Sequence, residues 1–130
     1  MTASSTAFRA PDRNTCARLN DDCRWSRGDR SNFRHMLTSG VRALLDGDPG
    51  EPGEPRTTIL RQAQLQAEIR NYCFKPGDGP ERDFGAITFL DHKLLFKIDA
   101  YDRALEHGSP DPADAAVTLR VMTIMLAGEY

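Results

Sequence analysis

The side chains of this chain that could carry chemistry are acidic residues at turns. Asp83, Asp99 and Asp102 flank two apolar runs, and Asp111 follows a polar stretch that contains His107. Carboxylates gathered on turns are the ligands that Mg²⁺ and Ca²⁺ prefer. If the strand ends converge, Asp83, Asp99 and Asp102 could serve a metal-dependent hydrolase. Acidic residues at turns more often bond their own backbone, so we expect no metal site.

Two tyrosines, together with three of these acids, favour a binding surface over a catalytic centre. Tyr101 and Tyr130 carry aromatic rings with polar tips, which are favoured at protein interfaces. The candidate interface residues are Asp83, Asp99, Tyr101, Asp102 and Tyr130. The histidines and cysteines show no spacing typical of a zinc site or of an activated nucleophile. We therefore predict a non-catalytic protein that binds another protein and has no catalytic residue, metal or cofactor.

Arginines in the first third of the chain offer a different chemistry. Residues 1–45 hold eight Arg and four Asp, whereas residues 46–130 hold nine Lys or Arg and fifteen Asp or Glu. Arg18, Arg24, Arg27 and Arg34, with aromatic side chains between them, could bind phosphates while a ring stacks on a base. The formal net charge of −2 disfavours a dedicated nucleic-acid binder. Nucleic-acid binding through these arginines is therefore the alternative function.

Apolar periodicity predicts the elements that position these residues. They are, in chain order, a helix over 12–27, a strand over 33–38, a brief helix to Leu45, a helix over 57–72, and a hairpin of strands 84–90 and 93–98. In the hairpin we expect Leu94, Phe96 and Ile98 to face the core. In helix 57–72 the predicted apolar side consists of Ile59, Leu60, Ala63, Ala67 and Ile69.

The segment after the hairpin predicts a C-terminal helix. Asp111 suits an N-cap, Pro112 the first helical position and Asp114 a capping box, and an apolar run follows from Val117 to Leu126. We expect this helix to lie across the hairpin. The predicted fold is α+β, with a small antiparallel sheet of about three strands packed by two or three helices and the C-terminal helix central.

Composition sets the domain organisation. Residues 1–11 predict a disordered arm, residues 12–130 a single α+β domain, and residues 46–56, with three Gly and three Pro, a flexible loop within it. The N-terminus lacks the apolar core of a secretory signal, and no segment is apolar enough to span a membrane. We expect a cytoplasmic protein with no membrane partner, and its oligomeric state is left open.

Several motifs resemble a known family. Asp83-Phe84-Gly85, then Phe96 to Asp99, and the stretch from Thr123 to Tyr130 are similar to short alphaproteobacterial proteins classed as domain of unknown function 3768. The resemblance covers about residues 13–130. It implies a soluble bacterial protein, often found on plasmids or other mobile elements, with no known activity. A regulatory or accessory role toward host or defence machinery is the corresponding expectation. Arg82 replaces the His usual before Asp83, which disfavours an enzyme.

Overall fold

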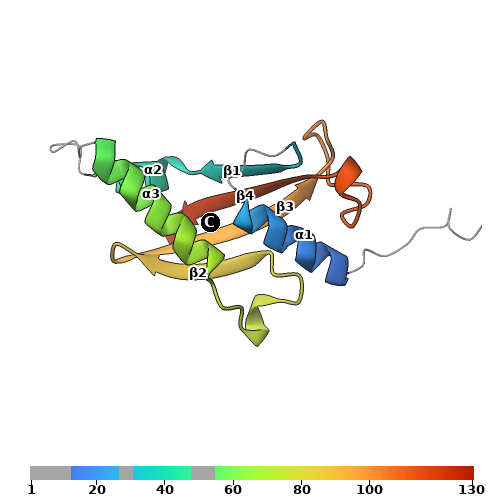
Figure 1. The fold of residues 1–130 in the computed structure, drawn as a ribbon, viewed down its shortest axis with the longest axis horizontal. Helices are drawn as coiled ribbons and strands as arrows, with labels where there is room; N and C mark the ends of the chain where they lie inside the picture. The colour runs from blue at the N-terminus through green and yellow to red at the C-terminus, as the bar shows by residue number, and fades with distance from the viewer. Residues whose placement is uncertain (1–12, 27–30, 48–54) are drawn as a thin grey trace, which may run out of the picture.

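The computed structural model of this chain describes residues 13–26, 31–47 and 55–130 (Figure 1). The arm predicted over 1–11 and most of the loop predicted over 46–56 lie outside the described residues. The main elements are α1 (Arg13–Trp25), β1 (Phe33–Leu37), α2 (Ser39–Asp46), α3 (Pro55–Arg70), β2 (Phe84–Phe89), β3 (His92–Tyr101) and β4 (Leu119–Leu126). Three single 3₁₀ turns accompany them, η2 (Pro76–Asp78), η3 (Ala115–Val117) and η4 (Ala127–Glu129).

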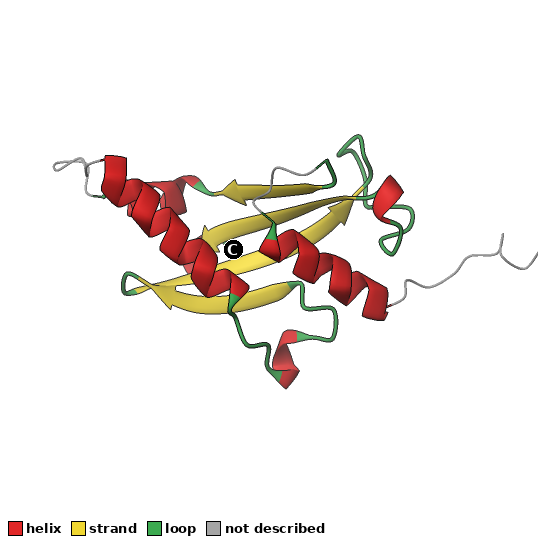
Figure 2. Cartoon of the chain, in the orientation of Figure 1, coloured by secondary structure: helices red, strands yellow, loops and turns green. Residues whose placement is uncertain are grey.

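The four strands form one mixed sheet in the order β1-β4-β3-β2. The hairpin of β2 and β3 is antiparallel, β3 pairs antiparallel with β4, and β1 pairs parallel with β4. The predicted α+β class and the predicted hairpin are confirmed (Figure 2). The sheet has four strands where about three were expected, and it is mixed rather than antiparallel.

The predicted central C-terminal helix is wrong, because residues 119–126 form β4 instead. The strand lies between β1 and β3, where both sides of it are buried, and such strands carry continuous apolar runs that periodicity alone cannot separate from a buried helix. The two acids predicted to cap this helix bind backbone amides in short turns instead. Asp111 Oδ1 accepts from the Ala113 amide at 3.2 Å, and Asp114 Oδ1 accepts from the Ala116 amide at 2.9 Å, which caps η3.

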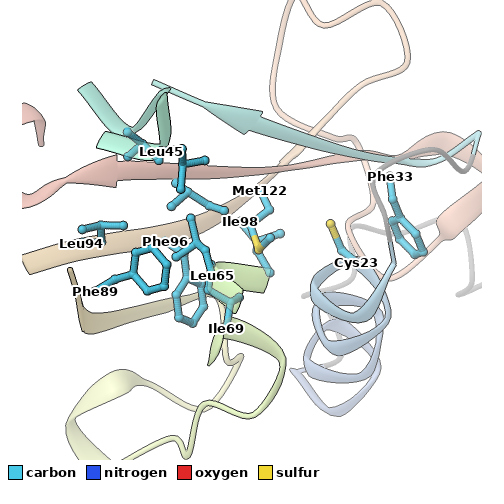
Figure 3. Packing of buried hydrophobic residues seen from close by; sticks show 12 residues of the cluster. Cys23, Phe33, Leu45, Leu65, Ile69, Phe89, Leu94, Phe96, Ile98 and Met122 are labelled. Atoms are coloured by element: carbon cyan, nitrogen blue, oxygen red, sulfur yellow. The ribbon is translucent and has the colours of Figure 1, made fainter. Parts of the chain in front are cut away.

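All three α-helices pack on one face of the sheet (Figures 1 and 2). The core between these layers joins residues from every helix and strand (Figure 3). As predicted, the β3 residues that enter it are alternate ones. The cluster comprises Cys23, Phe33, Val41, Leu45, Leu65, Ile69, Phe89, Leu94, Phe96, Ile98, Met122 and Ile124.

The rotation of α3 about its axis differs from the predicted one. Leu65 and Ile69 are buried, whereas Ile59 and Leu60 are 67% and 62% exposed and Ala63 and Ala67 are also exposed. Hydrogen bonds near the middle of α3 and at its C-terminal end hold the helix in this rotation. Arg61 Nη1 donates to the Leu45 carbonyl at 3.3 Å, and Arg24 Nη1 donates to the carbonyls of Ile69 and Arg70 at 3.2 and 2.8 Å. The more apolar side of α3 therefore faces away from the sheet.

Candidate functional site

The sheet face opposite the helices is the candidate functional site, and we call it the open face. Because side chains alternate along a strand, the neighbours of Leu94, Phe96 and Ile98 point away from the helices. Directly paired residues share a face, so the register extends the open face across the sheet. It consists of Arg34, Met36, Phe84, Ala86, Thr88, Lys93, Leu95, Lys97, Asp99, Tyr101, Leu119, Val121, Thr123 and Met125.

The middle of the open face is a hydrophobic floor. Leu95, Leu119, Val121 and Met125 are only 4–9% exposed, although α1, α2 and α3 all pack on the other side of the sheet. Longer side chains on the same face surround this floor, among them the exposed Met36. The open face therefore combines a closely packed apolar centre with an aromatic and charged rim.

Tyr130 joins the open face by folding back from the end of β4. Its ring packs edge-on against the ring of Phe84, with centroids 5.9 Å apart and planes at 81°. The Tyr130 side chain is nevertheless 78% exposed. In Figure 1 the mark for this end of the chain lies over the middle of the sheet rather than beyond its edge. Tyr130 is therefore a positioned but accessible aromatic side chain.

Glu129 holds this C-terminal turn in place. Its carboxylate accepts hydrogen bonds from the Thr38 hydroxyl at 2.6 Å, the Leu126 amide at 2.8 Å and the Gly40 amide at 3.3 Å. The Thr38 hydroxyl is the largest cause, followed by the backbone amides, of a lowered pKa of the Glu129 carboxyl. The ionised carboxylate thus ties the C-terminal turn to the start of α2.

The open face is cationic in a chain that is anionic overall. Arg34, Lys93 and Lys97 contribute three positive charges and Asp99 one negative charge, which gives a local charge of +2 against −2 for the whole chain. Lys97 Nζ lies 3.1 Å from Asp99 Oδ2. The hydrogen bond to Asp99 is the main cause of a raised pKa of Lys97, so the ammonium group stays charged.

Three of the five predicted interface residues meet on the open face, namely Asp99, Tyr101 and Tyr130. Asp83 precedes β2, and its carbonyl accepts from the Ile98 amide at 2.8 Å, so strand alternation places its side chain on the helix side. Asp102 lies in the turn after β3, where Oδ1 accepts from the Glu106 amide at 3.0 Å.

The three acids of the hydrolase hypothesis accordingly do not face one another. Asp83 belongs to the helix side, Asp99 to the open face and Asp102 to a turn. Among the described residues, no three His, Cys, Asp or Glu side chains gather closely enough to hold a metal ion.

The four predicted nucleic-acid arginines do not share a surface. Arg18 is exposed on α1, which packs on the helix side, whereas Arg34 lies on the open face. Arg27 lies outside the described residues.

Arg24 is buried and bound within the fold. In addition to the α3 carbonyls, its guanidinium contacts Asp21 Oδ1 at 2.9 Å and lies 5.1 Å from the centroid of the Phe74 ring. Its hydrogen bonds close the C-terminal end of α3, so this side chain serves the fold rather than a phosphate.

Several open-face residues are missing from the sequence-based candidates. Lys97 and Lys93 could have been found, because strand alternation already places them opposite Phe96. Met36 could not, since its neighbours on the face come from β4, which the sequence suggests is a helix. Phe84 gains its place through its pairing with Lys97 and its contact with Tyr130.

Fold and surface together define a small α+β protein whose helices cover one side of a four-stranded mixed sheet. The chain matches the family of proteins of unknown function DUF3768 over residues 37–129, and it belongs to that family. The matched region holds α2, α3 and most of the open face, whereas Arg18, Arg24, Arg34 and Met36 precede it and Tyr130 follows it. No curated protein and no solved structure matches the chain at a significant level. Within the described part of the chain, no helix has the length and apolar character needed to cross a bilayer.

Proposed function

We propose that this protein is a non-catalytic accessory factor that binds a protein partner through the open face. The observation that supports this most directly is the rim of accessible side chains, with Met36 57% and Tyr130 78% exposed, around the apolar floor of a sheet face that no described α-helix covers. Protein interfaces combine a buried apolar centre with a polar rim, and aromatic residues are enriched in them. Tyr101 and Tyr130 are the aromatic contacts that this proposal favours.

The charge of the open face specifies the chemistry of the partner. A local charge of +2 on a chain of net charge −2 favours a partner that surrounds an apolar patch with carboxylates. Lys97 and Arg34 would attract such a surface during encounter. In line with the family resemblance, the proposed setting is the cytoplasm of a bacterium, with the gene on a mobile element and host or defence machinery as the partner.

The same residues support one second candidate. Cations next to accessible aromatic rings on a four-stranded sheet also suit single-stranded nucleic acid, whose bases stack on such rings. This version uses Lys97, Tyr101 and Tyr130 on the open face, together with Arg34, the one arginine of the predicted set that the described residues place there. The net negative charge of the chain and the carboxylate of Asp99 both oppose the binding of phosphates, so they favour a protein partner over nucleic acid.

A matched pair of charge reversals tests the proposal. Lys97→Glu changes the open face, whereas Arg18→Glu changes an exposed cation on α1. Wild type and both variants are used to capture proteins from the source organism, with quantification by mass spectrometry. A protein depleted with Lys97→Glu and retained with Arg18→Glu is then purified and titrated. We expect Lys97→Glu to weaken this binary complex by about tenfold, with most of the loss at low salt.

The proposal fails if no captured protein distinguishes Lys97→Glu from Arg18→Glu, or if the purified complex is indifferent to Lys97→Glu. An oligothymidylate titration by fluorescence anisotropy at low salt separates the two candidates. A flat titration retains the protein partner. Salt-sensitive binding that Lys97→Glu removes would replace the protein partner with single-stranded nucleic acid. Circular dichroism of each variant checks that the fold is unchanged.

A further inference from the structure

The chain after β4 joins the helix side of the sheet to the open face. Strands β1 and β4 run parallel and end side by side, and α2 begins directly after β1 on the helix side. Beyond β4 the chain turns through η4, which contacts β3, and Tyr130 then lies against Phe84 on the open face. The Glu129 carboxylate reaches back to Thr38 and Gly40 at the start of α2. We call this turn, η4 with Tyr130, the C-terminal strap.

Gly40 leaves the space that the C-terminal strap needs. It lies in the first turn of α2, where glycine is less favourable than alanine, and its φ is not positive, so the backbone does not require a glycine there. A Cβ at Gly40 would lie 2.7 Å from Oε1 of Glu129 and 2.8 Å from Cδ1 of Leu126. Both atoms are the ends of flexible side chains, so an added methyl group would displace the Glu129 carboxylate rather than the helix. The glycine at this position therefore serves the approach of Glu129.

The position of Tyr130 depends on the hydrogen bonds of Glu129. The Tyr130 side chain is largely exposed, and one edge-on ring contact is too weak to order such a side chain against its rotamer entropy. The Glu129 carboxylate, in contrast, is bonded from two strand ends that are far apart in sequence, by Thr38 and Gly40 after β1 and by Leu126 at the end of β4. Hydrogen bonds to a carboxylate are stronger than those between neutral groups. They fix the residue directly before Tyr130.

We propose that the C-terminal strap has a closed and an open position, and that Glu129 is the residue that positions Tyr130 on the open face. In the closed position, which the structure shows, the Tyr130 ring is ordered beside Phe84. In the open position the carboxylate leaves Thr38 and Gly40, and the ring leaves Phe84. An ordered side chain loses less rotamer entropy on binding, so the closed position is the one that favours a partner. This consequence for binding rests on the proposed function, whereas the two positions do not require a partner.

Gly40→Ala tests the strap without changing Glu129 or either ring. Two NMR signals of the full chain report the closed position. One is the nuclear Overhauser effect between the rings of Tyr130 and Phe84, and the other is slow hydrogen exchange of the Leu126 amide, which donates to Glu129 at 2.8 Å. We expect Gly40→Ala to abolish the first signal and to speed the exchange of the Leu126 amide about tenfold. Glu129→Ala should have the same two effects.

Gly128→Ala is the matched control, because it makes the same substitution within the strap and a Cβ at Gly128 meets nothing within 4 Å. We expect it to keep both signals at the wild-type level. A Gly40→Ala or Glu129→Ala variant that keeps either signal overturns the proposal, and so does a Gly128→Ala variant that loses them. These measurements use the protein alone, so their failure is distinct from a failure of the capture experiment with Lys97→Glu. Circular dichroism confirms that each variant is folded.

Discussion

Arg120, in the middle of the sheet, donates from Nε to Oδ1 of Asn20 on α1 at 2.8 Å, and both side chains are buried. Arg120 Nη2 also donates to the Pro112 carbonyl at 2.6 Å, and Asn20 Nδ2 donates to the Glu81 carbonyl at 3.0 Å. These hydrogen bonds join α1, β4 and two loops into one network. Burial lowers the pKa of Arg120, yet guanidinium groups remain protonated in proteins, so the network contains a buried positive charge.

Replacing Arg120 should destabilise the fold severely. Arg120→Met leaves Asn20 Oδ1 and the Pro112 carbonyl without this donor, and we expect the free energy of unfolding to fall by about 2–4 kcal/mol. Urea denaturation followed by circular dichroism measures it. Arg42→Met, at an exposed position on α2, is the control and should change the free energy by less than about 0.5 kcal/mol. Equal losses in the two variants would show that the network is unimportant.

Gly85 should tolerate no larger residue. A Cβ there would lie 2.5 Å from Cε1 of Phe96 and 2.9 Å from Cε2 of Tyr72. Both rings are fixed, since they pack edge-on at 5.3 Å. Gly85→Ala is therefore expected to cost about 1–3 kcal/mol through overpacking.

Gly77→Ala supplies the comparison, because a Cβ at Gly77 meets nothing within 4 Å. We expect the midpoint of urea unfolding to fall for Gly85→Ala and to stay near wild type for Gly77→Ala. Equal midpoints would mean that the aromatic cluster yields without cost.

The Glu129 carboxylate should make the stability depend on pH in the acid range. Its pKa in the folded chain is lowered below the ordinary value, so its contribution is fully present above the unfolded pKa and is lost as the pH falls through the folded pKa. Glu129→Gln should lower the melting temperature by a few degrees at pH 7, and this difference from wild type should vanish in strong acid.

Asp78 is the internal comparison for that experiment. Hydrogen bonds from the Lys75 amide and the Tyr72 hydroxyl lower the pKa of Asp78, so its contribution has the same sign. Asp78→Asn should keep the Glu129 difference intact, because the two carboxylates lie in separate turns. A difference in melting temperature between Glu129→Gln and wild type that stays the same at every pH would contradict the proposed role of Glu129.

Thiol reactivity should separate the three cysteines. Cys73 is exposed, whereas Cys16 and Cys23 are buried. Burial raises the pKa of Cys16 and raises that of Cys23 to about 12, so neither forms the reactive thiolate at neutral pH. A chromogenic disulfide reagent should titrate one thiol in the native protein and three after denaturation. Cys73→Ser should remove the native signal, and rapid labelling of Cys23 would indicate local opening of α1.

The sequence predicts the elements before Tyr101 well, because each carries a local signal. Helix α1 shows the spacing of Cys16 and Cys23, and the hairpin alternates around Phe96. The turn of the hairpin is the exception. The predicted strand bounds leave residues 91 and 92 for it, whereas Leu90 and Asp91 form it with positive φ of 49° and 63°, and His92 begins β3. The apolar run that forms β4 has no periodicity that separates a strand from a buried helix. Only its pairing with β1 and β3 makes it a strand, and this pairing is a property of the tertiary fold.

The open face could be predicted from the sequence only in part. Asp99 and Tyr101 could be placed on one face from strand alternation alone, whereas the floor formed by Val121 and Met125 required β4 to be a strand. The orientation of α3 could not be predicted either, because it depends on long-range hydrogen bonds from Arg24. Apolar residues on α3 are numerous enough to offer two candidate sides, and these bonds select the less apolar one for the core.

The pairing of Phe33 with Arg120 has a consequence for biosynthesis. β4, which lies between β1 and β3, is the last of the four strands in chain order, so β1 and the β2–β3 hairpin are synthesised before the strand that joins them. Until β4 inserts, the facing edges of β1 and β3 and the part of the core around Met122 and Ile124 remain open to chaperones, proteases and other nascent chains. Productive folding of this protein should therefore be comparatively slow, as expected when the decisive contacts join distant parts of a chain.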